Sequence, residues 1–198
     1  MDGELETVIG DGAAIRPFTT IYAGVKIGRD FQSGQGACIR EDNVIGDDVS
    51  IGTHAVLEIR NRIGNGARIH TGCFMEDVKI GDHVFIGPNV VFTDDPHPMK
   101  CPRYLDCLGG ATVEDYAKIG ANCTILPGVR IGRHAMIGAG TVVVRDVSER
   151  AVLMGNPGRE TGKIDDLTCP PGFFERPYVW EPYTEGEVQD AEEARKRP

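Results

Sequence analysis

The chain has 198 residues, of which 40% are hydrophobic and 26% are charged, and its formal net charge is −9. This acidic balance disfavours nucleic acid and anionic membranes as partners, although a local basic pocket for a phosphorylated ligand remains compatible with it. No apolar run of about 18 residues is present. The acidic start "MDGELETVIG" lacks the apolar core of a signal peptide, so we expect a cytoplasmic protein with no membrane-spanning segment.

A mostly aliphatic residue recurs every six positions along most of the chain. The first series of these anchor residues contains Ile9, Ile15, Ile21, Ile27, Ser33, Ile39, Ile45, Ile51, Leu57, Ile63, Ile69 and Met75. A single five-residue step leads to a second series, Ile80, Ile86 and Phe92, and the last series contains Val113, Ile119, Ile125, Ile131, Ile137 and Val143. A small or β-branched residue follows most anchors after four positions, and glycine follows many of them directly.

This strict period of six predicts a β-helix. A helical stripe recurs every 3.6 residues, whereas six residues suit one flat face of a coil that turns at each corner. Three faces form a triangular coil of about 18 residues, with anchors inside, small residues at the corners and glycine or polar residues in the turns. We therefore expect an all-β fold, with a parallel β-helix domain over residues 1–148 and about seven coils between Val8 and Val147.

The repeat is interrupted by an extended loop near residues 93–111, with the sequence "TDDPHPMKCPRYLDCLGGA". His97 lies there between Pro96 and Pro98, which restrict the backbone around it. Histidine is the usual general base, because its pKa lies near neutrality. We expect His97 to be a catalytic base, and the alternative is an ordinary surface histidine.

Two segments resemble the hexapeptide-repeat acyltransferases. The segment "IGPNVVFTDDPHP", residues 86–98, is similar to the part of the maltose and galactoside O-acetyltransferases that carries the catalytic histidine. The continuation from "FTDD" to "PRY" is closer to the nucleotide-aminosugar N-acetyltransferases. Residues 119–164, which include "GNPGR", resemble the acetyl-CoA-binding end of the superfamily.

The resemblance implies a left-handed β-helix and an acetyl-CoA-dependent acetyltransferase. Its small-molecule acceptor would be a sugar or a nucleotide-linked amino sugar. Members of the superfamily are typically homotrimers with active sites between subunits, and flat triangular sides suit packing around a threefold axis.

Asn89 and Asp94 are the other candidate catalytic residues. In the family pattern the asparagine equivalent to Asn89 contacts the acceptor, and the alternative is that Asn89 only closes a turn. Asp94 is expected to orient His97 or to bind an acceptor amine, and the alternative is a solvated acidic loop.

The cofactor is expected to lie along the later coils. Ala121 and Ala139 are 18 residues apart, so they should stack on adjacent coils. In the family, such positions present their backbone to the pantetheine arm of coenzyme A, and small residues let the cofactor approach. Arg145, Arg159 and Lys163 are expected to contact the phosphates, and the alternative for each is a solvated surface charge.

Three cysteines lie outside the repeat positions: Cys101, Cys107 and Cys169. With a fourth ligand such as His97 they would suit a structural zinc site, which needs four nitrogen or sulfur ligands. If His97 binds zinc, it cannot be the base. Cys73 and Cys123 occupy small-residue positions of the repeat, so we expect them to contribute packing.

Three histidines share one place in the repeat, three residues after an anchor: His54, His83 and His134. This place should face solvent in a turn. Residues 149–183 are expected to form a C-terminal cap, in which the aromatic residues of "PPGFFERPYVWEPY" dock on the helix end or on a neighbouring subunit. Residues 184–198 are expected to be a disordered tail.

Two other functions remain open at this stage. One is a γ-class carbonic anhydrase-like metalloprotein, which shares the expected fold but needs three zinc-binding histidines. The closest histidine pair here is His70 and His83. The other is a non-catalytic structural trimer.

Overall fold

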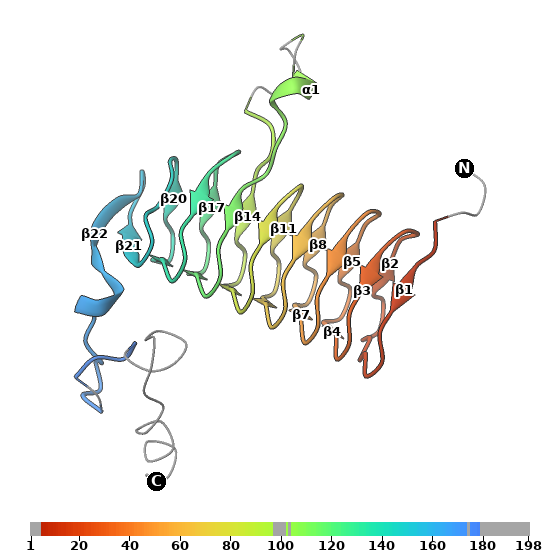
Figure 1. Cartoon of the computed structure of the whole chain (residues 1–198), viewed down its shortest axis with the longest axis horizontal. Helices are drawn as coiled ribbons and strands as arrows, with labels where there is room; N and C mark the ends of the chain where they lie inside the picture. Colours follow the sequence, from red (N-terminus) through yellow and green to blue (C-terminus); the bar gives the residue numbers. More distant parts are fainter. Residues whose placement is uncertain (1–4, 97–101, 103, 174, 179–198) are drawn as a thin grey trace.

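The computed structural model describes residues 5–96, 102, 104–173 and 175–178. These residues form a parallel β-helix of about eight turns, consistent with the left-handed class that the sequence predicts. Figure 1 shows the coils stacked along one axis, with a single loop projecting sideways from the middle of the stack. The stack is about one turn longer than expected, because isolated bridges and the strand after Val147 continue the pairing at its ends.

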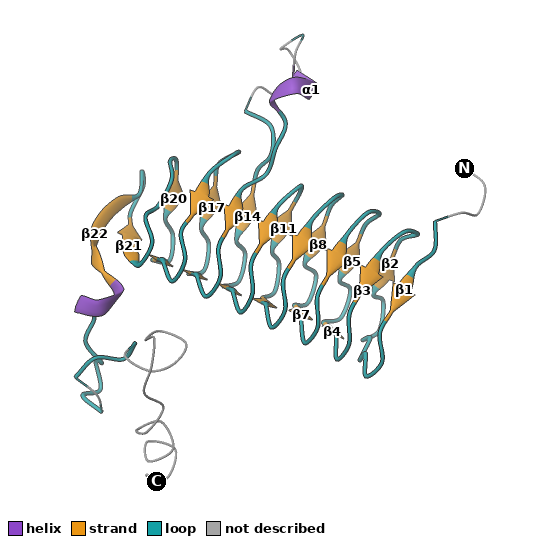
Figure 2. Ribbon diagram, in the orientation of Figure 1, coloured by secondary structure: helices purple, strands orange, loops and turns teal. Residues whose placement is uncertain are grey.

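The strands form three sheets, one for each face of the coil (Figure 2). Sheet A contains β1 (Val8–Ile9), β3 (Lys26–Ile27), β6 (Val44–Ile45), β9 (Arg62–Ile63), β12 (Lys79–Ile80), β15 (Thr112–Val113) and β18 (Arg130–Ile131). Sheet B contains β4 (Gln32–Ser33), β7 (Ser50–Ile51), β10 (Arg68–Ile69), β13 (Phe85–Ile86), β16 (Lys118–Ile119), β19 (Met136–Ile137), β21 (Ala151–Met154) and β22 (Arg159–Lys163). Sheet C contains β2 (Thr20–Ile21), β5 (Cys38–Ile39), β8 (Val56–Leu57), β11 (Phe74–Met75), β14 (Val91–Phe92), β17 (Thr124–Ile125) and β20 (Val142–Val143).

The anchor residues form the core, as the six-residue period predicts. From β3 to β20 the second residue of each strand is buried, whereas the first faces outward. Each aliphatic anchor removed from water contributes about 1.5–3 kcal/mol. The small residues between strands are buried as well. Cys73 and Cys123 are among them, with each Sγ 3.2 Å from a backbone carbonyl oxygen, so their expected packing role is confirmed.

The corners explain the abundance of glycine, asparagine and aspartate in the turns. Most corners contain one residue with positive φ, a conformation that these residue types tolerate best. Glycine directly after an anchor has a second reason. A Cβ on Gly120 would lie 2.6 Å from the backbone nitrogen of Ala139, so only glycine lets these coils approach.

The register locates the one large irregularity of the helix. Stacked strands are usually offset by 18 residues, as between Lys26 and Val44. The five-residue step shortens the offset to 17, as between Arg62 and Lys79. The loop lengthens it to 33, between Lys79 and Thr112, and so adds 15 residues (33 minus 18). Both changes fall at the corner between sheets C and A, so all three sheets keep their register.

The C-terminal end of the stack is closed by an antiparallel pair, β21 with β22, followed by the short helix η1 (Ile164–Asp166). Ile164 is buried against this end. Farther along, the ring of Tyr178 lies 5.3 Å from Nζ of Lys118 on sheet B, so part of the aromatic segment docks on the helix. Phe173 is exposed, and the remaining aromatic residues of that segment lie outside the described residues: Phe174, Tyr183 and Trp180.

The parallel stack continues through β21, beyond residue 148. Within the described part of the chain, no helix is long and apolar enough to cross a membrane.

Candidate active site

Three of the predicted site residues meet at the corner between sheets B and C. Asn89, Ala121 and Ala139 follow β13, β16 and β19, which are neighbours in sheet B. The N–H of Gly140 donates to the carbonyl oxygen of Ala121 at 2.8 Å, so the two alanines stack on adjacent coils, as expected. Nδ2 of Asn89 lies 3.3 Å from Oδ1 of Asn122, one coil closer to the C-terminus.

The two alanines change the character of this corner. In the earlier coils the stacked positions carry larger side chains: Gln35, Thr53, Thr71 and Pro88. From Ala121 onward the column has only methyl groups, and Ala139 is exposed. A Cβ on the adjacent Gly140 would meet no atom within 4 Å. We call the surface formed by Ala121, Ala139 and Gly140 the alanine ledge. It is open enough for an extended ligand to lie against the backbone.

Asn89 combines both roles that the sequence suggested for it. Its φ is 58°, and its N–H donates to the carbonyl oxygen of Thr71 at 2.9 Å, so it does close a turn. Its side chain is nevertheless exposed beside the alanine ledge. The turn is closed by the backbone of Asn89, and its side-chain amide contacts Asn122 at the exposed surface.

Asp94 lies at the other end of β14, at the corner between sheets C and A where the loop leaves the helix. The backbone N–H and the hydroxyl of Thr93 both donate to the carbonyl oxygen of Ile125, at 3.0 and 3.1 Å. The N–H of Gly109 donates to the carbonyl oxygen of Asp94 at 2.9 Å, which ties the two ends of the loop together. The side chain of Asp94 is half-buried at this junction.

A second carboxylate, which the sequence did not single out, lies near Asp94. Burial raises the pKa of Glu76, and the neighbouring charges of Asp94 and Glu58 raise it further. The charges of Arg60 and Arg40 act on the pKa of Glu76 in the opposite direction, so the corner contains both acidic and basic groups. The six-residue pattern does not distinguish Glu76, because it is only the residue that directly follows an anchor, as in every other turn.

Of the predicted base and the predicted zinc ligands, only Cys107 and Cys169 are among the described residues. His97 and Cys101 lie outside the described residues. Cys107 belongs to α1 (Tyr104–Cys107) on the projecting loop, whereas Cys169 follows η1 beyond the C-terminal end of the stack (Figure 1). Among the described residues, no group of three or more histidine, cysteine, aspartate or glutamate side chains is arranged to hold a metal ion. Cys107 and Cys169 therefore belong to no such group.

The cations predicted to contact phosphates gather near the C-terminal end. Arg145 follows β20, and Arg159 and Lys163 begin and end β22. The N–H of Gly158 donates to the carbonyl oxygen of Val142 at 2.8 Å, so the start of β22 lies beside the start of β20. Arg145 and Arg159 are exposed, whereas Lys163 is half-buried and pairs with Glu160 at 2.7 Å.

The expectation that His134 faces solvent is wrong. His54 and His83 are exposed as expected, but only 5% of His134 is exposed. Its ring stacks on Tyr116 at 5.1 Å, and Tyr116 stacks in turn on His83 at 5.2 Å. Burial, followed by the charge of Arg133 among others, lowers the pKa of His134 to about 4. A neutral histidine in this position belongs to the packing of the corner between sheets A and B.

Lys118 is a further residue that the sequence did not reveal. Its Nζ donates to the carbonyl oxygen of Tyr116 at 3.2 Å and faces the ring of Tyr178. Burial lowers its pKa to about 8. Tyr178 lies 60 residues later in the chain, and no spacing rule connects the two positions.

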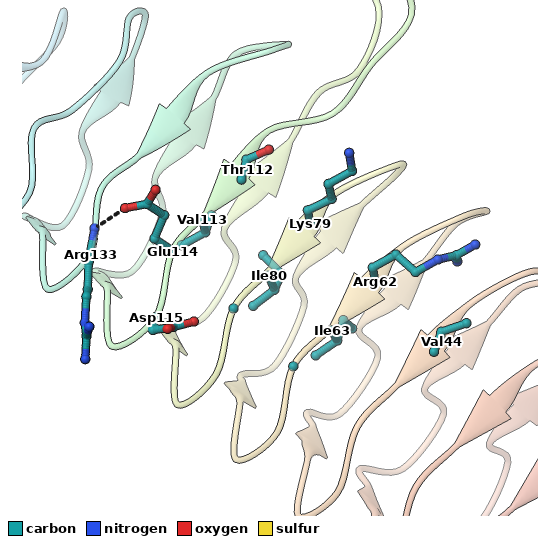
Figure 3. A pocket seen from close by; sticks show the side chains of 12 residues that line it. Val44, Arg62, Ile63, Lys79, Ile80, Thr112, Val113, Glu114, Asp115 and Arg133 are labelled. Atoms are coloured by element: carbon teal, nitrogen blue, oxygen red, sulfur yellow. Dashed lines mark hydrogen bonds between the residues drawn. The ribbon is translucent and has the colours of Figure 1, made fainter. Parts of the chain in front are cut away.

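A groove of about 700 Å³ lies on the outer face of sheet A (Figure 3). Figure 3 shows Arg62, Lys79 and Thr112 along one side and Glu114, Asp115 and Arg133 toward the other. Of the apolar residues that line it, Val44 faces outward, whereas Ile63, Ile80 and Val113 are buried anchors of the core. We call this space the sheet A groove. The sequence allowed for a local basic pocket but did not place one.

Comparison with known proteins supports the repeat assignment. The family described as "Bacterial transferase hexapeptide (six repeats)" matches residues 62–94 and 110–145, on either side of the loop. The galactoside O-acetyltransferase of Lactococcus lactis is 36% identical over 93 residues, which cover 46% of this chain and 45% of that protein. The chain spans about half the length, or less, of the curated relatives it matches.

Two solved structures extend the similarity. The maltose O-acetyltransferase of Clostridium difficile has a TM-score of 0.51 and 28% identity, over 58% of this chain and 66% of that one. AntD, an N-acyltransferase of Bacillus cereus, was solved with dTDP-4-amino-4,6-dideoxyglucose and coenzyme A. It has a TM-score of 0.55 over 79% of this chain and 83% of that one. Its 18% identity shows a common fold.

Proposed function

Since the chain belongs to the hexapeptide-repeat acyltransferase superfamily, we propose that it is an acetyl-CoA-dependent acetyltransferase that acts on a sugar or a nucleotide-linked amino sugar. A shared fold does not by itself determine an activity, so the site has to support the proposal. The observation that carries it is the position of the alanine ledge directly beside the exposed amide of Asn89. An extended thioester and its acceptor can meet at such a corner.

The proposed reaction is one acyl transfer. The acceptor nitrogen or oxygen attacks the acetyl carbonyl carbon, the carbon–sulfur bond breaks, and coenzyme A leaves as a thiol. His97 accepts the proton that the acceptor loses and passes it to the departing sulfur, and backbone N–H groups at the alanine ledge stabilise the oxyanion. Asn89 holds the acceptor in position, and this positioning lowers the entropic cost of the transfer.

The carboxylates at the loop junction and the C-terminal cations would serve the two substrates. Asp94, together with Glu76, would attract the amine of an amino sugar. Arg145, Arg159 and Lys163 would hold the phosphates of coenzyme A at the end of the alanine ledge, because guanidinium and ammonium groups form charge-assisted hydrogen bonds with phosphate.

We also propose that the active unit is a homotrimer with its sites between subunits. The outward residues of sheet C include no charged side chain: Thr20, Cys38, Val56, Phe74, Val91, Thr124 and Val142. A flat uncharged face of this kind suits contact with another copy. Light scattering of the purified chain should give a mass near three times that of one chain. A monomeric mass at micromolar concentration would contradict the proposal.

The activity is tested by thiol release from acetyl-CoA in the presence of a panel of sugars, amino sugars and nucleotide-linked amino sugars. We expect release that requires both acetyl-CoA and one acceptor class, and we expect His97→Ala to lower it by about 10²–10⁴-fold. His54→Ala is the matched control, because His54 is an exposed turn histidine of an earlier coil. No acceptor-dependent release with any member of the panel would overturn the assignment.

A further inference from the structure

The positive-φ residues of the turns between sheets B and C form a stack that reaches the alanine ledge. Four consecutive members are Gly72, Asn89, Asn122 and Gly140, with φ angles of 70°, 58°, 57° and 73°. Each donates its backbone N–H to a carbonyl oxygen of the preceding coil, which keeps the stack in register. We call these four residues the turn column.

In the turn column, each asparagine side chain contacts the coil before its own. A Cβ on Gly72 would lie 2.3 Å from Oδ1 of Asn89, so the amide of Asn89 fills the place that a side chain at position 72 would take. In the same way, Oδ1 of Asn122 lies 3.3 Å from Nδ2 of Asn89. The amide nitrogen of Asn89 is thus covered by an acceptor oxygen from the following coil.

Asn122 receives no such cover, because the following coil has a glycine in the column. Gly140 has no side chain to reach Asn122, and a Cβ on Gly140 would meet no atom within 4 Å. Among the described residues, the side-chain amide of Asn122 contacts only that of Asn89, through its oxygen. Asn122 is exposed, so both N–H groups of its amide remain for another partner.

The open place beside Asn122 adjoins the alanine ledge. Asn122 directly follows Ala121, and Gly140 directly follows Ala139, so both border the surface on which an extended ligand would lie. An oxygen atom of that ligand could accept from Nδ2 of Asn122, as Oδ1 of Asn122 accepts from Asn89. The amide is a neutral donor, so it suits a carbonyl oxygen, whereas phosphate is held more strongly by cations.

We propose that Asn122 is a positioning residue whose side-chain amide donates a hydrogen bond to a carbonyl oxygen of the ligand on the alanine ledge. The identity of the ligand rests on the proposed function, because coenzyme A carries amide carbonyl groups in its pantetheine arm. The contact with Asn89 orients the amide of Asn122 in advance, which lowers the entropic cost of the new bond. Gly140 contributes by leaving the place open.

The test is calorimetric titration of the purified full-length chain with coenzyme A and with 3′,5′-ADP, which carries the adenosine end of the cofactor but lacks the pantetheine arm. Asn122→Gly removes the amide, and glycine keeps the positive φ without strain. Gly140→Asn places a side chain in the open place, and asparagine also tolerates positive φ. Circular dichroism can verify the fold of each variant.

The matched control is His54→Gly. His54 belongs to the same corner of an earlier coil, is exposed, and has a φ of 54°, so the substitution makes the same kind of change away from the ledge. It should bind both probes as the unmodified chain does.

We expect Asn122→Gly to weaken the binding of coenzyme A about three- to tenfold, as the loss of one neutral hydrogen bond predicts. Gly140→Asn should weaken it at least as much, because its side chain would cover the amide of Asn122. Neither substitution should change the binding of 3′,5′-ADP more than about twofold, because this probe has no carbonyl group to accept from Asn122. A merely structural role of Asn122 would instead weaken both probes together.

Three results would overturn the proposal: no binding of coenzyme A by the unmodified chain, equal binding of coenzyme A by Asn122→Gly, or equal weakening of both probes. The proposed function fails separately. If coenzyme A binds through Asn122 but no thiol is released from acetyl-CoA with any acceptor, the role of Asn122 stands and the activity does not. If thiol is released and Asn122→Gly binds coenzyme A normally, the activity stands and the role of Asn122 does not.

Discussion

At the scale of single residues, burial controls which side chains can change charge. His134 is held between coils at the corner of sheets A and B, where its stacking on Tyr116 leaves 5% of it exposed. Its pKa of about 4 lies well below the ordinary value for an unfolded histidine, about 6.5. Between pH values of about 4 and about 6.5, His134 is therefore neutral in the folded chain and protonated in the unfolded chain.

This difference makes the stability of the chain depend on pH in a definite direction. As the pH falls through about 6.5, the unfolded chain binds a proton at His134 and the folded chain does not. The contribution of His134 is therefore complete above that pH and is lost progressively until the pH reaches about 4. In urea unfolding measured between pH 7 and 4.5, His134→Phe should lose less stability than the unmodified chain.

His54→Phe serves as the control for this experiment, because His54 also follows its anchor by three residues but is exposed, at a corner between sheets B and C. It should reproduce the pH dependence of the unmodified chain. Equal slopes for His134→Phe and the unmodified chain would show that His134 does not carry the effect.

Residue positions inside the repeat could be predicted, and contacts between distant segments could not. The period placed Cys73 and Cys123 in the core and stacked Ala121 on Ala139, because these depend only on distance from an anchor. The burial of His134 depends on Tyr116, whose ring occupies the same corner of the adjacent coil.

At the scale of elements, the loop leaves and re-enters the helix at a tightly packed junction. Gly110 lies where the loop returns to the stack. A Cβ there would be 2.4 Å from the carbonyl oxygen of Glu76 and 2.6 Å from that of Asp77, both of which are backbone atoms. Gly109 is its neighbour, and a Cβ on Gly109 would meet no atom within 4 Å.

Gly110→Ala should therefore destabilise the chain by about 1–3 kcal/mol, since backbone must move to accept the methyl group. Thiol release should fall as well, because the displaced junction carries Asp94 and leads to His97. Gly109→Ala should leave both close to the unmodified values. Urea unfolding and thiol release measured on both variants check this prediction, and equal stabilities would contradict it.

The sequence allowed the place of the loop to be predicted but not its consequences. The break in the period located it near residues 93–111, and the structure shows that it leaves the helix at the corner between sheets C and A. The raised pKa of Glu76 was not foreseeable, because it results from burial beneath the junction and from the charge of Asp94.

At the scale of the whole molecule, the faces and corners of the triangular coil have different surfaces. The outward strand residues of sheet C are uncharged, sheet A carries a groove lined by both acidic and basic residues, and the corner between sheets B and C carries the alanine ledge. The all-β class and the triangular coil were predictable, since a six-residue period admits few other folds. The groove was not, because it depends on which outward residues become neighbours 17 or 33 positions apart.

The most direct measurement of the proposed function is calorimetric titration of coenzyme A into the unmodified chain, Ala139→Phe and Thr53→Phe. Phenylalanine at Ala139 would block the alanine ledge, whereas Thr53 occupies the same column in an earlier coil. The unmodified chain and Thr53→Phe should bind coenzyme A with similar affinity, and Ala139→Phe should bind it at least about tenfold more weakly. Absence of coenzyme A binding by the unmodified chain, or full binding by Ala139→Phe, would contradict the proposed site.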